Sequence, residues 1–199
     1  LGFPFIFRGA LDAQLNGDDC DLLNIDDFEV VLSEGFDNSQ DNTNLDYSGW
    51  VNFAEQGTEL WTEQVFRGNG YTEFSAYRTF EDVNIGWLVT PGFDLTGSTN
   101  SFINFKLAQH HLDDDQNNTL EVFISNDFDG SNVLSATWNK LSVQIPNMSN
   151  SWYAFQDSGL IDVSSYEGTI HIGFKYVGSG TNTSLDGGYF VDDILFLKK

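Results

Sequence analysis

The sequence is poor in cysteine and in basic residues. Among 199 residues there is one cysteine, Cys20, which excludes an internal disulfide and a zinc site built from cysteines. Lys and Arg number 8 against 30 Asp and Glu, so the formal net charge is −22. A chain this acidic repels phosphate backbones and anionic lipids, and nucleic acid is therefore not an expected partner.

Long apolar runs and catalytic motifs are absent as well. No stretch approaches the ~18 consecutive apolar residues of a membrane helix, and the start lacks the pattern of a signal peptide, so we expect no transmembrane segment, signal or anchor in this chain. There is no Gly-x-Ser-x-Gly elbow, His-Glu-x-x-His pair, P-loop or dinucleotide fingerprint. The sequence nominates no catalytic residue.

The three histidines offer little acid–base or metal chemistry. Period-two alternation places His171 on the solvent-facing side of a strand. His110 and His111 end another strand, close to three aspartates. Because adjacent strand residues point to opposite faces, we expect at most one of these two rings to share a site with a given carboxylate.

What the sequence does have is apolar and aromatic surface arranged for strands. Hydrophobic residues make up 40% and aromatics 15%, enough for the core of one domain. The apolar pattern has period two or short runs, interrupted by Gly, Asn, Asp and Ser, which predicts an all-β sandwich of two packed sheets. The expected strands are Phe28–Phe36, Trp50–Ala54, Leu60–Phe66, Phe74–Arg78, Gly86–Val89, Phe102–Ala108, Leu120–Ser125, Leu141–Ile145, Trp152–Asp157, Thr169–Val177 and Gly188–Leu197.

Residues 1–27 differ from the rest of the chain. An apolar opening over 3–7 is followed by an acidic stretch over 16–21. We expect this segment to be an N-terminal leader, or the tail of a preceding domain, docked on one sandwich domain that spans residues 28–199.

The last expected strand suggests a metal site. Both of its faces are apolar except at Asp192 and Asp193. Strict alternation puts Asp193 on the face of Tyr189, Val191, Leu195 and Leu197, and Asp192 on the face of Phe190, Ile194 and Phe196. A buried carboxylate costs several kcal/mol unless it is paired or bound to a metal. Since basic partners are scarce, Ca²⁺ is the candidate, with Glu34 and Asp37 as further ligands; aspartates that are hydrogen-bonded at a strand end are the alternative.

A series of motifs in about Phe28–Leu197 resembles the choice-of-anchor J and cleaved-adhesin domains. The motifs are Glu34–Asp37, Trp50, Phe74–Tyr77, Gly86–Leu95, Leu120–Gly130, Ala136–Leu141, Gly173–Tyr176 and Tyr189–Ile194. The resemblance implies an antiparallel jelly-roll sandwich, similar to MAM and carbohydrate-binding-module folds, in a secreted or surface-anchored bacterial protein. It also implies structural calcium at Asp192, Asp193, Glu34 and Asp37, and no catalytic residue.

Aromatic side chains offer a way to bind sugars, because a pyranose ring stacks on an aromatic face. Trp61 and Tyr71 are the expected exposed candidates, since Trp61 alternates with polar residues and Tyr71 follows a glycine-rich turn. The other tryptophans are expected to pack in the structure: Trp50, Trp87, Trp138 and Trp152.

Together these features predict a secreted or cell-surface, non-catalytic binding or adhesion module for a glycan or a surface protein. Two alternatives stay open. One is a sandwich-fold polysaccharide hydrolase or lyase, which would need two carboxylates about 5–10 Å apart across a cleft. The other is a structural spacer domain of a larger surface protein.

Overall fold

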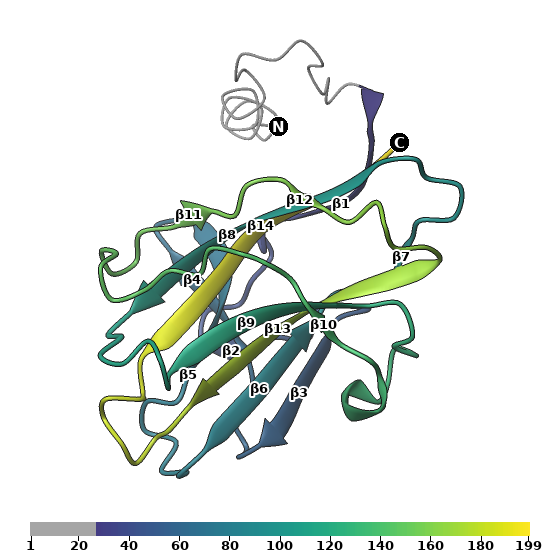
Figure 1. Ribbon diagram of the computed structural model, residues 1–199. Coiled ribbons are helices and arrows are strands. Elements are labelled where there is room, and N and C mark those ends of the chain that lie inside the picture. Colours follow the sequence, from purple (N-terminus) through teal and green to yellow (C-terminus); the bar gives the residue numbers. More distant parts are fainter. Residues whose placement is uncertain (1–26) are drawn as a thin grey trace.

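Two antiparallel β-sheets, packed face to face, form the part of the chain that the computed structural model describes, residues 27–199 (Figure 1). The first sheet contains, in spatial order, β11 (Gln156–Asp157), β8 (Ser101–His110), β14 (Gly188–Lys198), β5 (Asn69–Ser75), β4 (Thr62–Phe66) and β2 (Thr43–Asn44), with β1 (Glu29–Glu34) paired to β14 and β12 (Ile161–Asp162) paired to β8. The second contains β10 (Asn139–Lys140), β9 (Thr119–Ser125), β13 (Thr169–Gly178), β6 (Asn84–Val89) and β3 (Val51–Gln56), with β7 (Phe93–Asp94) paired to β13. The all-β, antiparallel two-sheet jelly-roll sandwich predicted from the sequence is confirmed. The expected leader lies outside the described residues, apart from Asp27.

Most expected strands are present, and three differ. The strand expected at Phe74–Arg78 overlaps β5 only at Phe74 and Ser75, because β5 begins at Asn69 and the chain turns at Tyr77 and Arg78. The segment 141–145 is not a strand, although Leu141, Val143 and Ile145 alternate as predicted and pack on the core. Of the expected strand Trp152–Asp157 only β11 forms, because Trp152 and Tyr153 lie in a turn, where Tyr153 has a positive φ of 61°. That turn leaves Trp152 half exposed, so its expected packing role is wrong.

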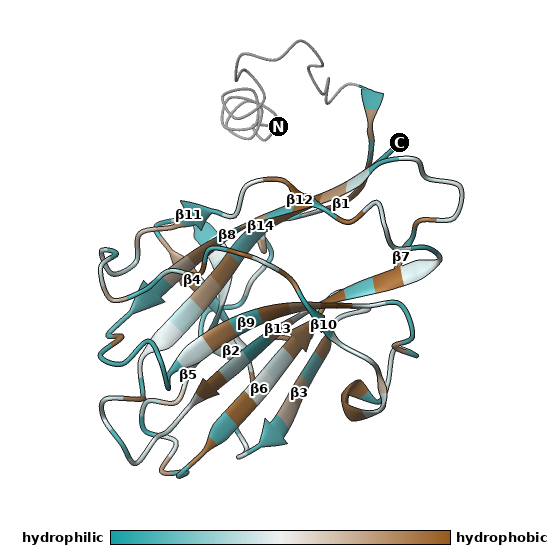
Figure 2. Ribbon diagram, viewed as in Figure 1, coloured by the Kyte–Doolittle hydropathy of each residue, from teal (hydrophilic) through white to brown (hydrophobic). Residues whose placement is uncertain are grey.

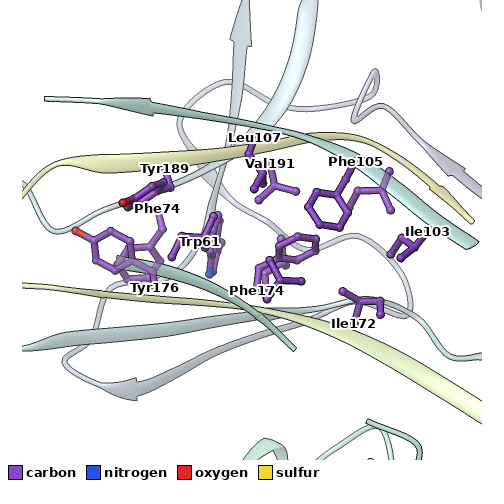
Figure 3. Packing of buried hydrophobic residues seen from close by; sticks show 14 of the residues in the cluster. Trp61, Phe74, Ile103, Phe105, Leu107, Ile172, Phe174, Tyr176, Tyr189 and Val191 are labelled. Carbon is purple, nitrogen blue, oxygen red and sulfur yellow. The ribbon is translucent and has the colours of Figure 1, made fainter. Parts of the chain in front are cut away.

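The core lies between the two sheets (Figure 3). Phe74 from the first sheet stacks on Tyr176 from the second, with ring centroids 4.4 Å apart. The Tyr176 hydroxyl donates a hydrogen bond to the Gly187 carbonyl, which satisfies its polar atom in an apolar setting. Hydrophobic residues alternate with hydrophilic ones along the strands, whereas the loops are mostly hydrophilic (Figure 2). No helix of the described residues is long and apolar enough to cross a membrane.

Strand β14 is buried on both faces, as predicted, but its alternation is interrupted. The register with β8 shifts between Asp192 and Leu195, and Asp193 has φ 49°, the signature of a bulge. The bulge reverses the predicted faces beyond this point: Ile194 joins Tyr189 and Val191 in the main core, whereas Leu195 is in a separate cluster on the outer face.

His171 is buried, which corrects the prediction that it faces solvent. Its ring lies on the outer face of the second sheet but is covered by Phe128, with centroids 4.9 Å apart at 85°. His171 Nδ1 donates a hydrogen bond to the Thr90 carbonyl at 2.9 Å. A second apolar cluster, which includes Trp87, covers this outer face. Alternation with period two showed that His171 points away from the main core, but it did not show whether solvent or a second cluster lies on that side.

Candidate binding cleft

A cleft of about 310 Å³ opens at one end of the outer face of the first sheet. Its lining residues come from four separate segments of the chain: the ends of β5 and β8, the loop before β11 and the loop before β14. They are Tyr77, His110, His111, Tyr153 and Asp186.

Strand register explains why these residues meet. Gly188 of β14 pairs with His110 on one side and with Ser75 on the other. A Cβ at Gly188 would lie 2.1 Å from His110 Nε2, so only glycine lets the imidazole lie across the strand. His110 passes over Gly188, where there is no side chain, and reaches Glu73 on β5, two residues before Ser75.

A hydrogen-bonded chain joins Glu73, His110 and His111. His110 Nε2 lies 2.7 Å from Glu73 Oε1, and His110 Nδ1 lies 2.8 Å from His111 Nδ1. A carboxylate can only accept, so His110 Nε2 carries the proton that it shares with Glu73. In a neutral His110 ring Nδ1 is then an acceptor, and His111 Nδ1 donates to it. The expectation that the two rings point to opposite faces is wrong, because His111 leaves the strand with φ 50°.

Aromatic rings hold both histidines in place. His110 contacts Tyr153, with ring centroids 5.4 Å apart at 12°, and Phe190, at 5.0 Å and 16°. Tyr153 and Phe190 also contact each other, with centroids 5.8 Å apart. Trp152 packs on His111 with ring centroids 4.1 Å apart. The rings at the rim stay open to solvent: Tyr77 is 58% exposed, Tyr153 55% and Trp152 50%. These residues, with Glu73 and Asp186, are termed the aromatic–histidine cleft below.

Tyr71 lies beside the cleft and does not line it. Its half-buried ring contacts Phe155, with ring centroids 5.7 Å apart, and Phe190, at 4.8 Å. Burial raises the pKa of the Tyr71 hydroxyl to about 12, and the nearby carboxylate of Glu73 adds to the shift. Phe190 in turn stacks on His110, so Tyr71 packs against a residue that positions the cleft histidine.

Trp61 is a core residue, and the prediction that it is exposed is wrong. Its side chain has no exposed surface, points between the sheets and packs edge-on against Phe74 at 5.7 Å (Figure 3). The side chain of Asn52 binds both the amide and the carbonyl of Trp61. Trp61 directly precedes β4, between Leu60 and Thr62, so alternation with polar residues did not decide which way its side chain points.

The four predicted calcium ligands have different surroundings. Asp193 forms an ion pair with Lys106 at 2.7 Å, and one Glu34 oxygen accepts the Phe36 amide at 2.8 Å. Asp37 is exposed. Among residues 27–199, no three His, Cys, Asp or Glu side chains are grouped so as to hold a metal ion. Calcium also takes backbone carbonyls and water as ligands, so calcium binding stays a prediction.

Asp192 is the most strongly perturbed carboxyl of the four. It is 2% exposed, and it accepts hydrogen bonds from Asn69 Nδ2 at 2.9 Å and from the Asp193 amide at 2.7 Å. Burial raises its pKa to about 7, and the charge of Asp193 adds to this effect. Near neutral pH the protein thus holds a proton on Asp192 in a large fraction of molecules.

Most of the cleft was not identifiable from the sequence. Glu73, Tyr153 and Asp186 lie outside the motifs, Tyr77 lies in the Phe74–Tyr77 motif, which indicates the fold, and strand alternation did not predict that His110 and His111 lie together. One signal was present: Trp152-Tyr153-Ala154-Phe155 places three aromatics in four residues after a polar loop. Such a density of rings at a turn indicates an aromatic surface.

Comparison with known proteins identifies the fold. No protein-family model matches the chain, and no curated protein matches its sequence. Among solved structures, it is similar to the K1 and K3 cleaved adhesin domains of Lys-gingipain from Porphyromonas gingivalis W83 and to the K2 domain of the same protein. The TM-scores for K1, K2 and K3 are 0.52, 0.54 and 0.56, at 14%, 16% and 17% identity; the matches cover 83–84% of this chain and 96–98% of those domains. The chain thus has the β-sandwich fold of cleaved adhesin domains.

Proposed function

We propose that this protein is a secreted or cell-surface, non-catalytic binding module that binds a glycan in the aromatic–histidine cleft. The observation that carries the proposal is the set of half-exposed rings of Tyr77, Trp152 and Tyr153 around an open cleft that also presents polar groups. Carbohydrate sites combine such aromatic faces with a few positioned polar groups. The similarity to domains described as adhesins supports a binding role.

The cleft is preorganised for binding. His110 is fixed by Glu73 and by the two rings that stack on it, and His111 is fixed by His110 and Trp152. Rigid aromatic anchors lose little side-chain entropy when a ligand docks. Both ring nitrogens of His110 are engaged by Glu73 and His111, so His111 Nε2 is the imidazole nitrogen that remains to hydrogen-bond a sugar stacked on Tyr153.

Substituting the rim aromatics tests this site. A glycan array selects a ligand, and isothermal titration calorimetry then compares the wild type with Trp152→Ala and Tyr153→Ala. We expect each variant to lose about tenfold or more in affinity, because an aromatic anchor at the centre of a site contributes about 1–3 kcal/mol.

Phe66→Ala is the matched control. Phe66 is also an exposed aromatic, at 61%, but it lies at the turn between β4 and β5, at the opposite end of β5 from the cleft. Equal losses in all three variants would contradict the proposed site. Turnover of a polysaccharide, abolished by changing one carboxylate, would replace the proposal with a hydrolase or lyase, and absence of any glycan ligand would favour a protein-binding or spacer domain.

The calcium prediction has its own test. It expects a higher melting temperature with Ca²⁺ than with EDTA, because an ion that binds only the folded state stabilises it by mass action. Asp192→Asn or Asp193→Asn then removes the difference, whereas Asp162→Asn, on β12, retains it. Identical melting of the wild type in Ca²⁺ and in EDTA would contradict calcium binding.

A further inference from the structure

We infer that the aromatic–histidine cleft selects a glycan bearing a positively charged amino group, and that the Asp186 carboxylate binds this group. The inference rests on the proposed function and adds the chemical class of its ligand. It follows from the partners of Asp186, the cleft walls and the surrounding charge.

The position of Asp186 leaves its carboxylate available to a ligand. Its backbone carbonyl accepts a hydrogen bond from Ser75 Oγ at 2.9 Å, which fixes the loop before β14 to the end of β5. The carboxylate lines the cleft, and no Lys or Arg within residues 27–199 forms an ion pair with it. Burial raises the pKa of Asp186, and the negative charge of Asp113 adds to the shift.

A ligand that covers this carboxylate displaces water and must supply hydrogen-bond donors in place of the water molecules. Leaving a carboxylate desolvated without a donor is costly, and a charged donor compensates best. An ammonium group supplies both the hydrogen bond and the opposite charge, whereas a hydroxyl supplies only the bond. The cleft therefore binds an amino sugar more tightly than a neutral one.

The walls and the wider charge favour the same ligand. The electron-rich faces of Tyr77 and Tyr153 attract cations that approach within about 6 Å. One such contact is present within the protein: the Arg78 guanidinium lies 4.8 Å from the centre of the Tyr77 ring. Arg78 itself does not line the cleft. Asp113 adds negative charge beside Asp186, and the whole chain carries −22. Anionic sugars are disfavoured by the same field.

The test uses two oligosaccharides that differ only at nitrogen: a glucosamine hexamer and its fully N-acetylated form. At low salt we expect the glucosamine hexamer to bind about tenfold more tightly, the size of one charge-assisted hydrogen bond. High salt and Asp186→Asn should each bring the ratio of the two affinities close to one. Asp162→Asn is the control and should preserve the ratio, because Asp162 is an exposed aspartate on β12 that pairs with Phe102, at the opposite end of β8 from His110.

The outcomes separate this inference from the proposed function. If both hexamers bind equally, or if Asp186→Asn leaves the ratio unchanged, the assignment to Asp186 is overturned while glycan binding stands. If neither hexamer nor any other glycan binds the folded protein, the proposed function itself fails. A lysine peptide that binds in the cleft as tightly as the glucosamine hexamer would overturn the choice of a glycan as the source of the amine.

Discussion

Replacing Asp192 with asparagine should stabilise the protein at neutral pH and remove a pH dependence that the wild type shows between about pH 4 and pH 7. The cause is burial, which raises the pKa of this carboxyl from 3.8 to about 7. Asparagine has nearly the same shape and carries no charge. Its Nδ2 group cannot accept, so one of the two hydrogen bonds that the Asp192 oxygens accept is lost, at a cost of about 1–3 kcal/mol that does not change with pH. Asparagine thus avoids placing an ionised group among Asn69, Phe190 and the β14 bulge.

The sign follows from proton binding. Between pH 4 and pH 7 the folded state holds a proton on Asp192 that the unfolded state releases, so stability falls as the pH rises and levels off above the folded-state pKa. The difference between the folded-state pKa of about 7 and the ordinary value of 3.8 corresponds to a loss of unfolding free energy on the order of 4 kcal/mol between pH 4 and pH 7. Exposed carboxyls with lowered pKa, such as Asp114, give the opposite slope, because their hydrogen bonds are lost on acidification. The readout is therefore the difference between variant and wild type.

Urea unfolding of both proteins in EDTA, from pH 4 to pH 8, measures this difference. It should grow in favour of Asp192→Asn as the pH rises to about 7 and then stay constant. Asp37→Asn controls for the general change in net charge. A difference between Asp192→Asn and wild type that is the same at every pH would show that Asp192 does not hold the proton.

The second large effect is at Trp61. Trp61→Ala should lower the free energy of unfolding by about 3–5 kcal/mol, because it leaves a cavity against Phe74 in a core with no exposed surface at this position. Trp61→Phe should cost clearly less. The buried Nε1 of Trp61 has no hydrogen-bond partner, so its removal leaves no acceptor unpaired.

Denaturant unfolding and glycan titration of Trp61→Phe together decide the role of this residue. The account expects reduced stability and unchanged affinity, since Trp61 lies between the sheets and the cleft lies on the outer face. Loss of glycan binding at full stability would restore Trp61 as a ligand-binding residue.

The sequence predicted what depends on local alternation. It identified the sandwich, most strands, and the burial of Asp192 within a strand apolar on both faces. It failed where alternation is interrupted. The bulge at Asp193 reverses the faces beyond it, and the positive φ of His111 brings two neighbouring rings together. Both positive-φ positions are occupied by residues other than glycine, so the sequence gives no local signal for either feature.

The candidate site depends on contacts that sequence does not encode locally. Tyr153 lines the cleft from a loop about forty residues beyond His111, Trp152 of the same loop packs on His111, and Asp186 comes from another loop. Lys106 similarly supplies the positive charge beside Asp193, for which the sequence suggested a metal ion. Such partners become visible only when the strands are placed side by side.

The three histidines permit the most direct test of the central claim. His110 and His111 lie in the cleft, whereas His171 is buried on the other sheet against Thr90 and serves as an internal control. Imidazole signals followed by nuclear magnetic resonance during titration with a bound oligosaccharide should shift for His110 and His111 and stay constant for His171. Saturating binding that leaves the signals of His110 and His111 unmoved would contradict the assignment of the cleft as the glycan site.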